Sequence, residues 1–190
     1  MITEEKLRTI WQGCIKNDRK AQELLYRTLA SKMMAVCIRY TNNDRDEAQD
    51  ILQEGFIKIF NNVNNFRGEG SLEGWIRRIM VHAAISRYRK QKNTVLTEDI
   101  GEDYDQFYTG YYHNQNLEIK ELLRLIQQLP ENYRAVFNMH AIEGYSHQEI
   151  ASTMGISELA SRTSLHRARL MLQNKLAKME MAEDELCMAG

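Results

Sequence analysis

The sequence predicts an all-α protein made of two small helical domains. Leu, Ile, Ala, Glu, Lys, Arg and Gln dominate the composition, there is one proline, and no long run alternates apolar and polar residues as a strand does. The chain has 190 residues, 43% of them hydrophobic, which is enough for one core or two small ones. Apolar residues recur at helical spacing on both sides of a long acidic stretch, so we expect a helical domain on each side.

The first half predicts three or four helices, over residues 4–16, 19–40, 44–63 and 71–91. Ser71 is a suitable N-cap for the last of them, after the glycine-rich loop 64–70. Its expected buried stripe consists of Leu72, Ile76, Ile79 and Ala83. A neighbouring, exposed stripe consists of Arg78, His82 and Arg89.

Residues 93–117 interrupt this pattern. They contain five acidic residues and no Lys or Arg, together with two glycines and a cluster of aromatic residues without helical periodicity. A structureless stretch of this length is unusual inside one compact domain. We therefore expect a flexible acidic linker, with domains at 1–92 and 118–179 and a C-terminal tail at 180–190.

The second half predicts a helix-turn-helix. Helices are expected near 118–128 and 130–142, with Pro130 in the first turn of the second. Ser146 and Glu149 have the spacing of a capping box, Gly155 suits a tight turn, and Ser157 caps the following helix. That helix is expected to turn Ser161, Leu165, Ala168 and Leu172 inward and Arg162, Thr163, His166 and Arg169 outward. A basic outer face favours DNA binding over a generic helical hairpin.

Charge distribution supports nucleic-acid binding although the net charge is only −1. Residues 74–92 carry six basic side chains and residues 159–178 carry five, with no acidic residue in either segment. Local potential, more than total charge, attracts phosphate. Solvated helix faces would also explain such runs, so charge alone does not decide.

Two sets of motifs resemble the extracytoplasmic-function (ECF) sigma factors of bacterial RNA polymerase. Residues 17–92 resemble the second conserved domain, or region 2, of that family, and residues 118–178 resemble its fourth, or region 4. The region 2 resemblance is carried by Asp46–Phe56, Phe66–Ser71 and Trp75–Ile79. The region 4 resemblance is carried by Leu129–Arg134, Glu143–Ser146, Ile150–Ala151, Gly155–Glu158 and His166–Arg169.

The resemblance implies a transcription initiation factor that binds core RNA polymerase and directs it to promoter DNA, under the control of an anti-sigma factor. Core polymerase would bind Asp50, Gln53 and Glu54. The −10 element would be opened and bound by Phe66, Arg67, Arg78, His82 and Arg89. The −35 element would be bound by Ser157, Arg162, Thr163, His166, Arg167 and Arg169. Strand opening needs cations for phosphates and a pocket or stacking surface for an unstacked base. Phe66 is the nearest aromatic candidate, whereas Trp75 is expected in the core.

Some positions depart from the family pattern. His82 and Ser86 stand where the family usually has Asn and often Asp, and Leu159-Ala160 stands where a Gly-Thr pair is common. The promoter sequence is therefore not carried over from the family.

Other classes of function find less support. The five histidines lack metal-ligand spacing, and there is no glycine-rich phosphate loop or nucleophile elbow. We expect no enzymatic activity, catalytic residue, metal or cofactor. No stretch is apolar enough to insert in a membrane, and three widely spaced cysteines favour the reducing cytoplasm. The alternatives are a helix-turn-helix regulator that acts as a dimer without polymerase, and a helical scaffold protein without DNA dependence.

Overall fold

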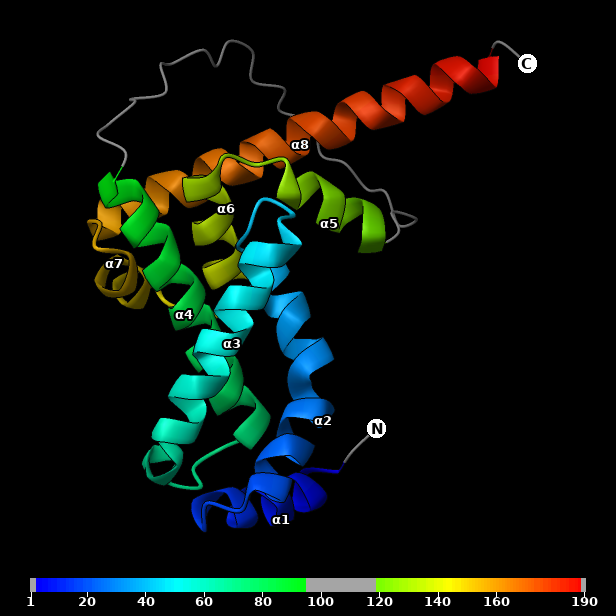
Figure 1. Ribbon diagram of the computed structural model, residues 1–190. Coiled ribbons are helices and arrows are strands. Elements are labelled where there is room, and N and C mark those ends of the chain that lie inside the picture. The colour runs from blue at the N-terminus through cyan, green and yellow to red at the C-terminus, as the bar shows by residue number, and fades with distance from the viewer. Residues whose placement is uncertain (1–2, 95–118, 189–190) are drawn as a thin grey trace. The chain divides into compact units, whose positions relative to one another are not determined.

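The computed structural model describes residues 3–94 and 119–188, which fall into two compact units, Met1–Thr94 and Val95–Gly190. Every regular element in these residues is a helix and none is a strand, which confirms the all-α class (Figure 1). The expected linker at 93–117 lies outside the described residues, except that 93 and 94 end a helix. No helix in the described part is long and apolar enough to cross a membrane.

The first unit contains four α-helices. These are α1 (Glu4–Ile15), α2 (Arg19–Ile38), α3 (Arg45–Asn61) and α4 (Leu72–Thr94), with a short 3₁₀ turn, η1 (Val63–Asn65), before the loop to α4. Asp44 accepts hydrogen bonds from the first-turn amides of α3, and the Ser71 hydroxyl accepts one from Gly74, as expected of N-caps. The expected helices are confirmed and number four, with boundaries that differ from the expected ones by at most three residues.

Helices α2, α3 and α4 run side by side and α1 lies across one end of them (Figure 1). Their interior is almost wholly apolar, and its largest buried side chains include Leu25, Leu29, Met33, Leu52, Ile59, Leu72, Ile76, Met80 and Ile85. Helices α3 and α4 approach closely at Gly55, where a Cβ atom would overlap the Met80 side chain. Ile79 departs from the expected buried stripe of α4, because it is only half-buried and lines a pocket.

The described residues of the second unit form three short α-helices and one long one. These are α5 (Ile119–Gln127), α6 (Glu131–Phe137), α7 (His147–Met154) and α8 (Glu158–Met188). The helix expected over 130–142 is divided, because α6 continues into a π-helical turn, η2 (Asn138–Ile142). The helix expected after the Ser157 cap is α8, which continues well beyond the predicted recognition residues to Met188.

Helix α8 packs against α5, α6 and α7, and one cluster of buried side chains joins it to α5. That cluster contains Leu125, Ile126, Leu129, Ala168 and Leu172. Arg134 is also buried, and its guanidinium donates to the carbonyls of Gln127 and Leu129 at 3.0 and 3.4 Å. It thereby satisfies two acceptors at the end of α5 that have no partner within the helix.

Candidate nucleic-acid interface

The exposed face of α4 carries the cations that the sequence predicts there. Arg78, His82 and Arg89 are all exposed and recur at helical spacing along one stripe. Arg67 is exposed in the loop before the helix. The unit therefore gathers basic side chains along one helix face and the adjoining loop.

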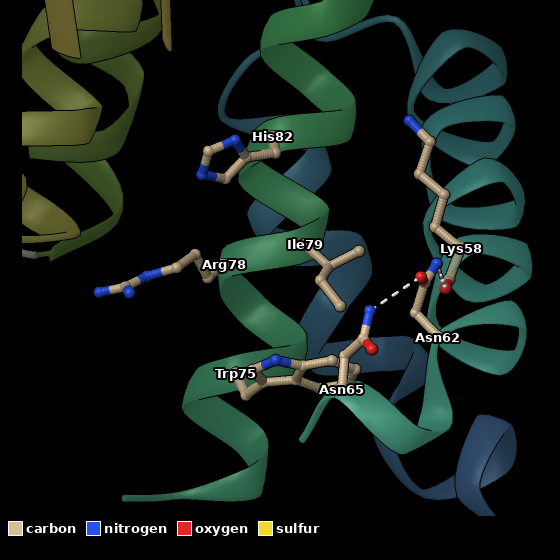
Figure 2. Close-up of a pocket in the computed structure, with 7 residues that line it drawn as sticks. All are labelled: Lys58, Asn62, Asn65, Trp75, Arg78, Ile79 and His82. Carbon is tan, nitrogen blue, oxygen red and sulfur yellow. Dashed lines mark hydrogen bonds between the residues drawn. The ribbon is translucent and has the colours of Figure 1, made fainter. Parts of the chain in front are cut away.

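A pocket of about 390 Å³ opens between α3, η1 and α4. It is lined by Lys58, Asn62, Asn65, Trp75, Arg78, Ile79 and His82 (Figure 2). On the η1 side, the side-chain amide of Asn65 donates to Asn62 Oδ1 at 3.0 Å, and the side-chain amide of Asn62 donates to the backbone carbonyl of Lys58 at 2.8 Å. Trp75 lies toward the base of the pocket and Ile79 lies between the two helices (Figure 2). The lining thus combines an indole, amides and cations, and no carboxylate.

The electrostatics of His82 reflect this concentration of positive charge. Partial desolvation, then the nearby Arg78 and Lys58 cations, lower the pKa of His82 from its usual value. A phosphate brought to the pocket would be attracted by the same cations that disfavour the imidazolium. Lys58 is the contributor that sequence analysis missed, because α3 and α4 come together only in the fold.

The loop after η1 is held by α1. Phe66 is half-buried, and its ring packs against Trp11 and Trp75 with centroid distances of 6.1 and 5.7 Å. Arg8 donates to the Gly70 carbonyl at 3.3 Å, and the Leu72 amide donates to Glu4 Oε1 at 3.0 Å. Phe66 therefore belongs to an aromatic cluster, whereas Trp75 both joins that cluster and lines the pocket.

The polar face of α3 lies where the sequence predicts it. Asp50 and Gln53 are exposed and Glu54 is half-exposed. Arg87 of α4 forms an ion pair with Asp50 at 3.6 Å and with Glu47 at 3.6 Å. Ile57, 59% exposed, follows Glu54 by three residues and Gln53 by four, so it lies on the same face of the helix. The face combines carboxylates with an exposed apolar side chain that sequence analysis did not single out.

The helix-turn-helix of the second unit is confirmed in its local geometry. Ser146 and Glu149 form the predicted capping box, and Gly155 ends α7 with a left-handed φ of 72°. The Ser157 hydroxyl accepts from the Ala160 amide at 3.1 Å and so caps α8. Ser161 is buried and shares a 2.9 Å hydrogen bond with His147 Nδ1, which joins the first turn of α8 to α7.

The outward side chains of α8 are disposed as expected. Arg162, Thr163, His166, Arg167 and Arg169 are all exposed. Arg162 forms an ion pair with Glu158 at 3.7 Å, and Arg167 donates to the Tyr133 hydroxyl at 3.1 Å. His166 and Arg169 continue the exposed face one turn and nearly two turns after Arg162. The opposite face of α8 is buried and carries Ser161, Leu165, Ala168 and Leu172, as the helical spacing predicts.

Comparison with known protein families gives two matches, in the order of the two units. The model described as Sigma-70 region 2 matches residues 25–94, and that described as Sigma-70, region 4 matches residues 119–172. The chain is 31% identical over 173 residues to the ECF RNA polymerase sigma-E factor of Haemophilus influenzae, covering 85% of this chain and 90% of the relative. The chain belongs to the ECF family of RNA polymerase sigma factors.

Further relatives agree with this assignment. The ECF RNA polymerase sigma factor SigX of Bacillus subtilis is 30% identical over 176 residues, covering 87% of this chain and 90% of the relative. The RNA polymerase sigma-H factor of Pseudomonas aeruginosa is 27% identical over 187 residues, covering 93% and 96%. Among solved structures, the sigma factor RpoE of Bartonella quintana, crystallised with the anti-sigma factor NepR, has a similar fold. Its TM-score is 0.51 at 19% identity, covering 82% of this chain and 96% of that one.

As a sigma factor, the protein is a transcription initiation factor, and its two matched segments correspond to units that the structure shows to be compact in themselves. The region 2 match begins at residue 25, within α2, so α1 lies outside it. The pocket, the basic face of α4 and the polar face of α3 all lie inside it.

Proposed function

We propose that this sigma factor binds core RNA polymerase through α3, opens the −10 element with α4 and the adjoining pocket, and binds the −35 element with α8. The observation that carries the proposal is the presence of two separate basic helix faces, one in each compact unit. Run-off transcription tests it directly: core polymerase with the purified chain should initiate at a selected promoter, and neither component alone should. A dimer that binds DNA and leaves core polymerase inactive would instead be a helix-turn-helix regulator.

The polymerase contact is assigned to Asp50, Gln53 and Glu54. Arg87 orients Asp50 from the neighbouring helix, and Ile57 adds apolar area beside the carboxylates. Charged groups at a protein interface set register and association rate, while a central apolar side chain contributes affinity. The double variant Asp50→Arg, Glu54→Arg should lose core polymerase in a pull-down and keep its helical circular dichroism.

The matched control is Glu5→Arg, Glu23→Arg, which makes the same change in net charge on α1 and α2. Glu23 forms an exposed i,i+4 ion pair with Arg27, whose loss costs little stability. Equal binding by the two double variants would remove the docking assignment.

The −10 contact is assigned to Phe66, Arg67, Arg78, His82 and Arg89, and the pocket beside Arg78 and His82 is suited to an extruded base. Its cations can hold the phosphates that flank the base, and Trp75 offers an aromatic surface. The variant Arg78→Ala, His82→Ala should reduce permanganate reactivity of −10 thymines while −35 protection is kept. Equal loss of both signals would contradict this division between the units.

The −35 contact is assigned to Ser157, Arg162, Thr163, His166, Arg167 and Arg169. Ser157 also caps the helix and Arg167 contacts Tyr133, so these two have structural roles besides the proposed one. Arg162→Ala should cost about 1–3 kcal/mol of binding free energy and relax preference at one −35 position. The control is Lys178→Ala, exposed far along α8, which should have a small effect that is blind to sequence. Sequence-blind losses from both variants would show that α8 touches only the backbone.

Control by an anti-sigma factor in the cytoplasm completes the proposal. The Bartonella quintana structure is a complex of a sigma factor with an anti-sigma factor. Co-purification of the chain with a partner that blocks core polymerase would support anti-sigma control.

We further propose the domain boundaries 1–92, 93–117, 118–179 and 180–190. Limited proteolysis should cut first within 93–117 and release two helical fragments, and protection of that segment would contradict the boundaries.

A further inference from the structure

Leu159 is a large apolar side chain that is mostly exposed in the free protein. It is 73% exposed, compared with 59% for Ile57 of α3. Single exposed leucines are ordinary on protein surfaces. What distinguishes this one is its position, as the second residue of α8.

The backbone of Leu159 is held in a fixed place. Ser157 caps the helix at the Ala160 amide, and the Thr163 hydroxyl donates to the Leu159 carbonyl at 3.0 Å. Ser161, on the opposite face, is buried and hydrogen-bonded to His147 of α7. The first turn of α8 is therefore anchored from behind, and Leu159 projects away from the unit.

The neighbours of Leu159 on this face are the residues proposed to contact DNA. Arg162, Thr163 and His166 follow it by three, four and seven residues, which places all four on one face of the helix. All are exposed. The N-terminal residues of a recognition helix are those that reach base edges in the major groove.

An apolar side chain on this helix face has one complementary group in the major groove of duplex DNA. The C5-methyl of thymine is the apolar group that a base pair presents there, and the other base-edge groups are hydrogen-bond donors and acceptors. The exposed arginines of the same face, Arg162 and Arg169, favour DNA as its occupant, because they are complementary to the phosphates on either side of the groove.

We propose that Leu159 is a specificity-determining residue of this sigma factor, and that it selects a thymine in the −35 element by packing against its C5-methyl group. The proposal deepens the proposed function and rests on it. The methyl contact removes about as much apolar area from water as one methylene does, so its loss should weaken binding about fourfold.

The test uses holoenzyme reconstituted from the full chain and core polymerase. Promoters are first selected from a library randomised at the −35 element. Each thymine there is then replaced singly by 2′-deoxyuridine, which lacks only the methyl group, and affinity is measured by competition. One such replacement should weaken binding of the wild-type holoenzyme about fourfold. Leu159→Ala should bind the thymine promoter about as weakly as the wild type binds the deoxyuridine one, and should not distinguish the two.

Two matched variants control for general effects. Leu24→Ala removes a leucine that is 49% exposed on α2 and should keep the full discrimination. Leu159→Met replaces the branched side chain by an unbranched apolar one of similar size and should keep most of the discrimination.

Several outcomes would overturn the proposal. One is a selected −35 element without any thymine whose methyl group matters to the wild type. Another is discrimination by Leu159→Ala as strong as that of the wild type. A uniform loss on thymine and deoxyuridine promoters alike, or loss of only a protein partner, would assign Leu159 to another contact. Failure of the wild-type holoenzyme to select any promoter would overturn the proposed function itself.

Discussion

The two units differ in what their helices bury. The first unit joins helices of 12, 20, 17 and 23 residues around large apolar side chains, and Thr41 is its buried polar residue. The second unit includes helices of 9, 7 and 8 residues and buries Arg134, Asn138 and Ser161. Short helices have proportionally more unpaired backbone groups at their ends. Long apolar stripes hold the first unit together, whereas the second also needs polar side chains at its helix junctions.

The distribution of tryptophan allows the two units to be followed separately. The chain has two tryptophans, Trp11 and Trp75, and both lie in the first unit. Urea unfolding followed by tryptophan fluorescence therefore reports the first unit, and far-ultraviolet circular dichroism reports both. Each of the following changes should move the unfolding transition of one unit and spare that of the other.

The largest effect should come from the apolar interior of the first unit. Leu29 is fully buried in α2, so Leu29→Ala should lower the free energy of unfolding by about 3 kcal/mol through lost burial and a cavity. The fluorescence transition should shift to lower urea, and the part of the circular dichroism signal from the second unit should stay. Equal shifts in both would mean that the units unfold together.

A buried arginine should give the next largest effect, in the second unit. Arg134→Met keeps the apolar volume and removes the donors to Gln127 and Leu129, at a cost of about 2 kcal/mol. The circular dichroism transition should shift and the fluorescence transition should not. Arg124→Met, an exposed change on α5, should cost under about 0.5 kcal/mol. Equal stability of the two variants would contradict the role given to Arg134.

The capping box should contribute less. Ser146→Ala removes the acceptor for the Glu149 amide and should cost about 1 kcal/mol, again only in the second unit. Ser152→Ala, an exposed position within α7, is the control and should be close to neutral. If Ser152→Ala cost as much stability as Ser146→Ala, the loss at Ser146 could not be assigned to its capping hydrogen bond.

The smallest effect should be the part of the second unit's pH dependence that comes from His147. Desolvation lowers the pKa of His147 from its usual value. Electrostatic repulsion from His140, whose ring stacks on it, and from Arg162 and Arg169 lowers this pKa further, and Glu158 opposes the shift. The unfolded state then binds more protons than the folded state as pH falls through about 6.5, so the unit loses stability on acidification. Unfolding at pH 7.5 and 5.5 should show a smaller loss in His147→Gln than in the wild type. An unchanged pH dependence in that variant would exclude His147 as the source.

Local signals were the ones that sequence analysis interpreted well. The caps at Ser71, Ser146 and Ser157 and the turn at Gly155 depend on residues within one helical turn, and the structure confirms all of them. The outward face of α8 followed from helical spacing alone. The assignment of these residues to polymerase and promoter contacts stays a prediction.

Features that depend on tertiary packing were missed. In the π-helical turn at Asn138–Ile142, the Glu143 amide donates a hydrogen bond of 3.0 Å to the Asn138 carbonyl. No residue within the segment predicts a π-helical turn. The packing of Phe66 against Trp11 was not predicted, because the two residues are far apart in sequence. The pocket could not be predicted from the sequence for the same reason, because its lining residues Lys58, Asn62 and His82 belong to elements that only the fold brings together.

The contacts between α1 and the loop before α4 have a consequence for how promoter strength can change during evolution. Three residues of α1, Glu4, Arg8 and Trp11, contact Leu72, Gly70 and Phe66, respectively. These three α1 residues lie outside the segment that matches the family's region 2. Substitutions in α1 can therefore loosen or stiffen the loop without altering a side chain proposed to face DNA. Such changes would adjust the rate of strand opening at every promoter of the regulon together and leave promoter choice intact.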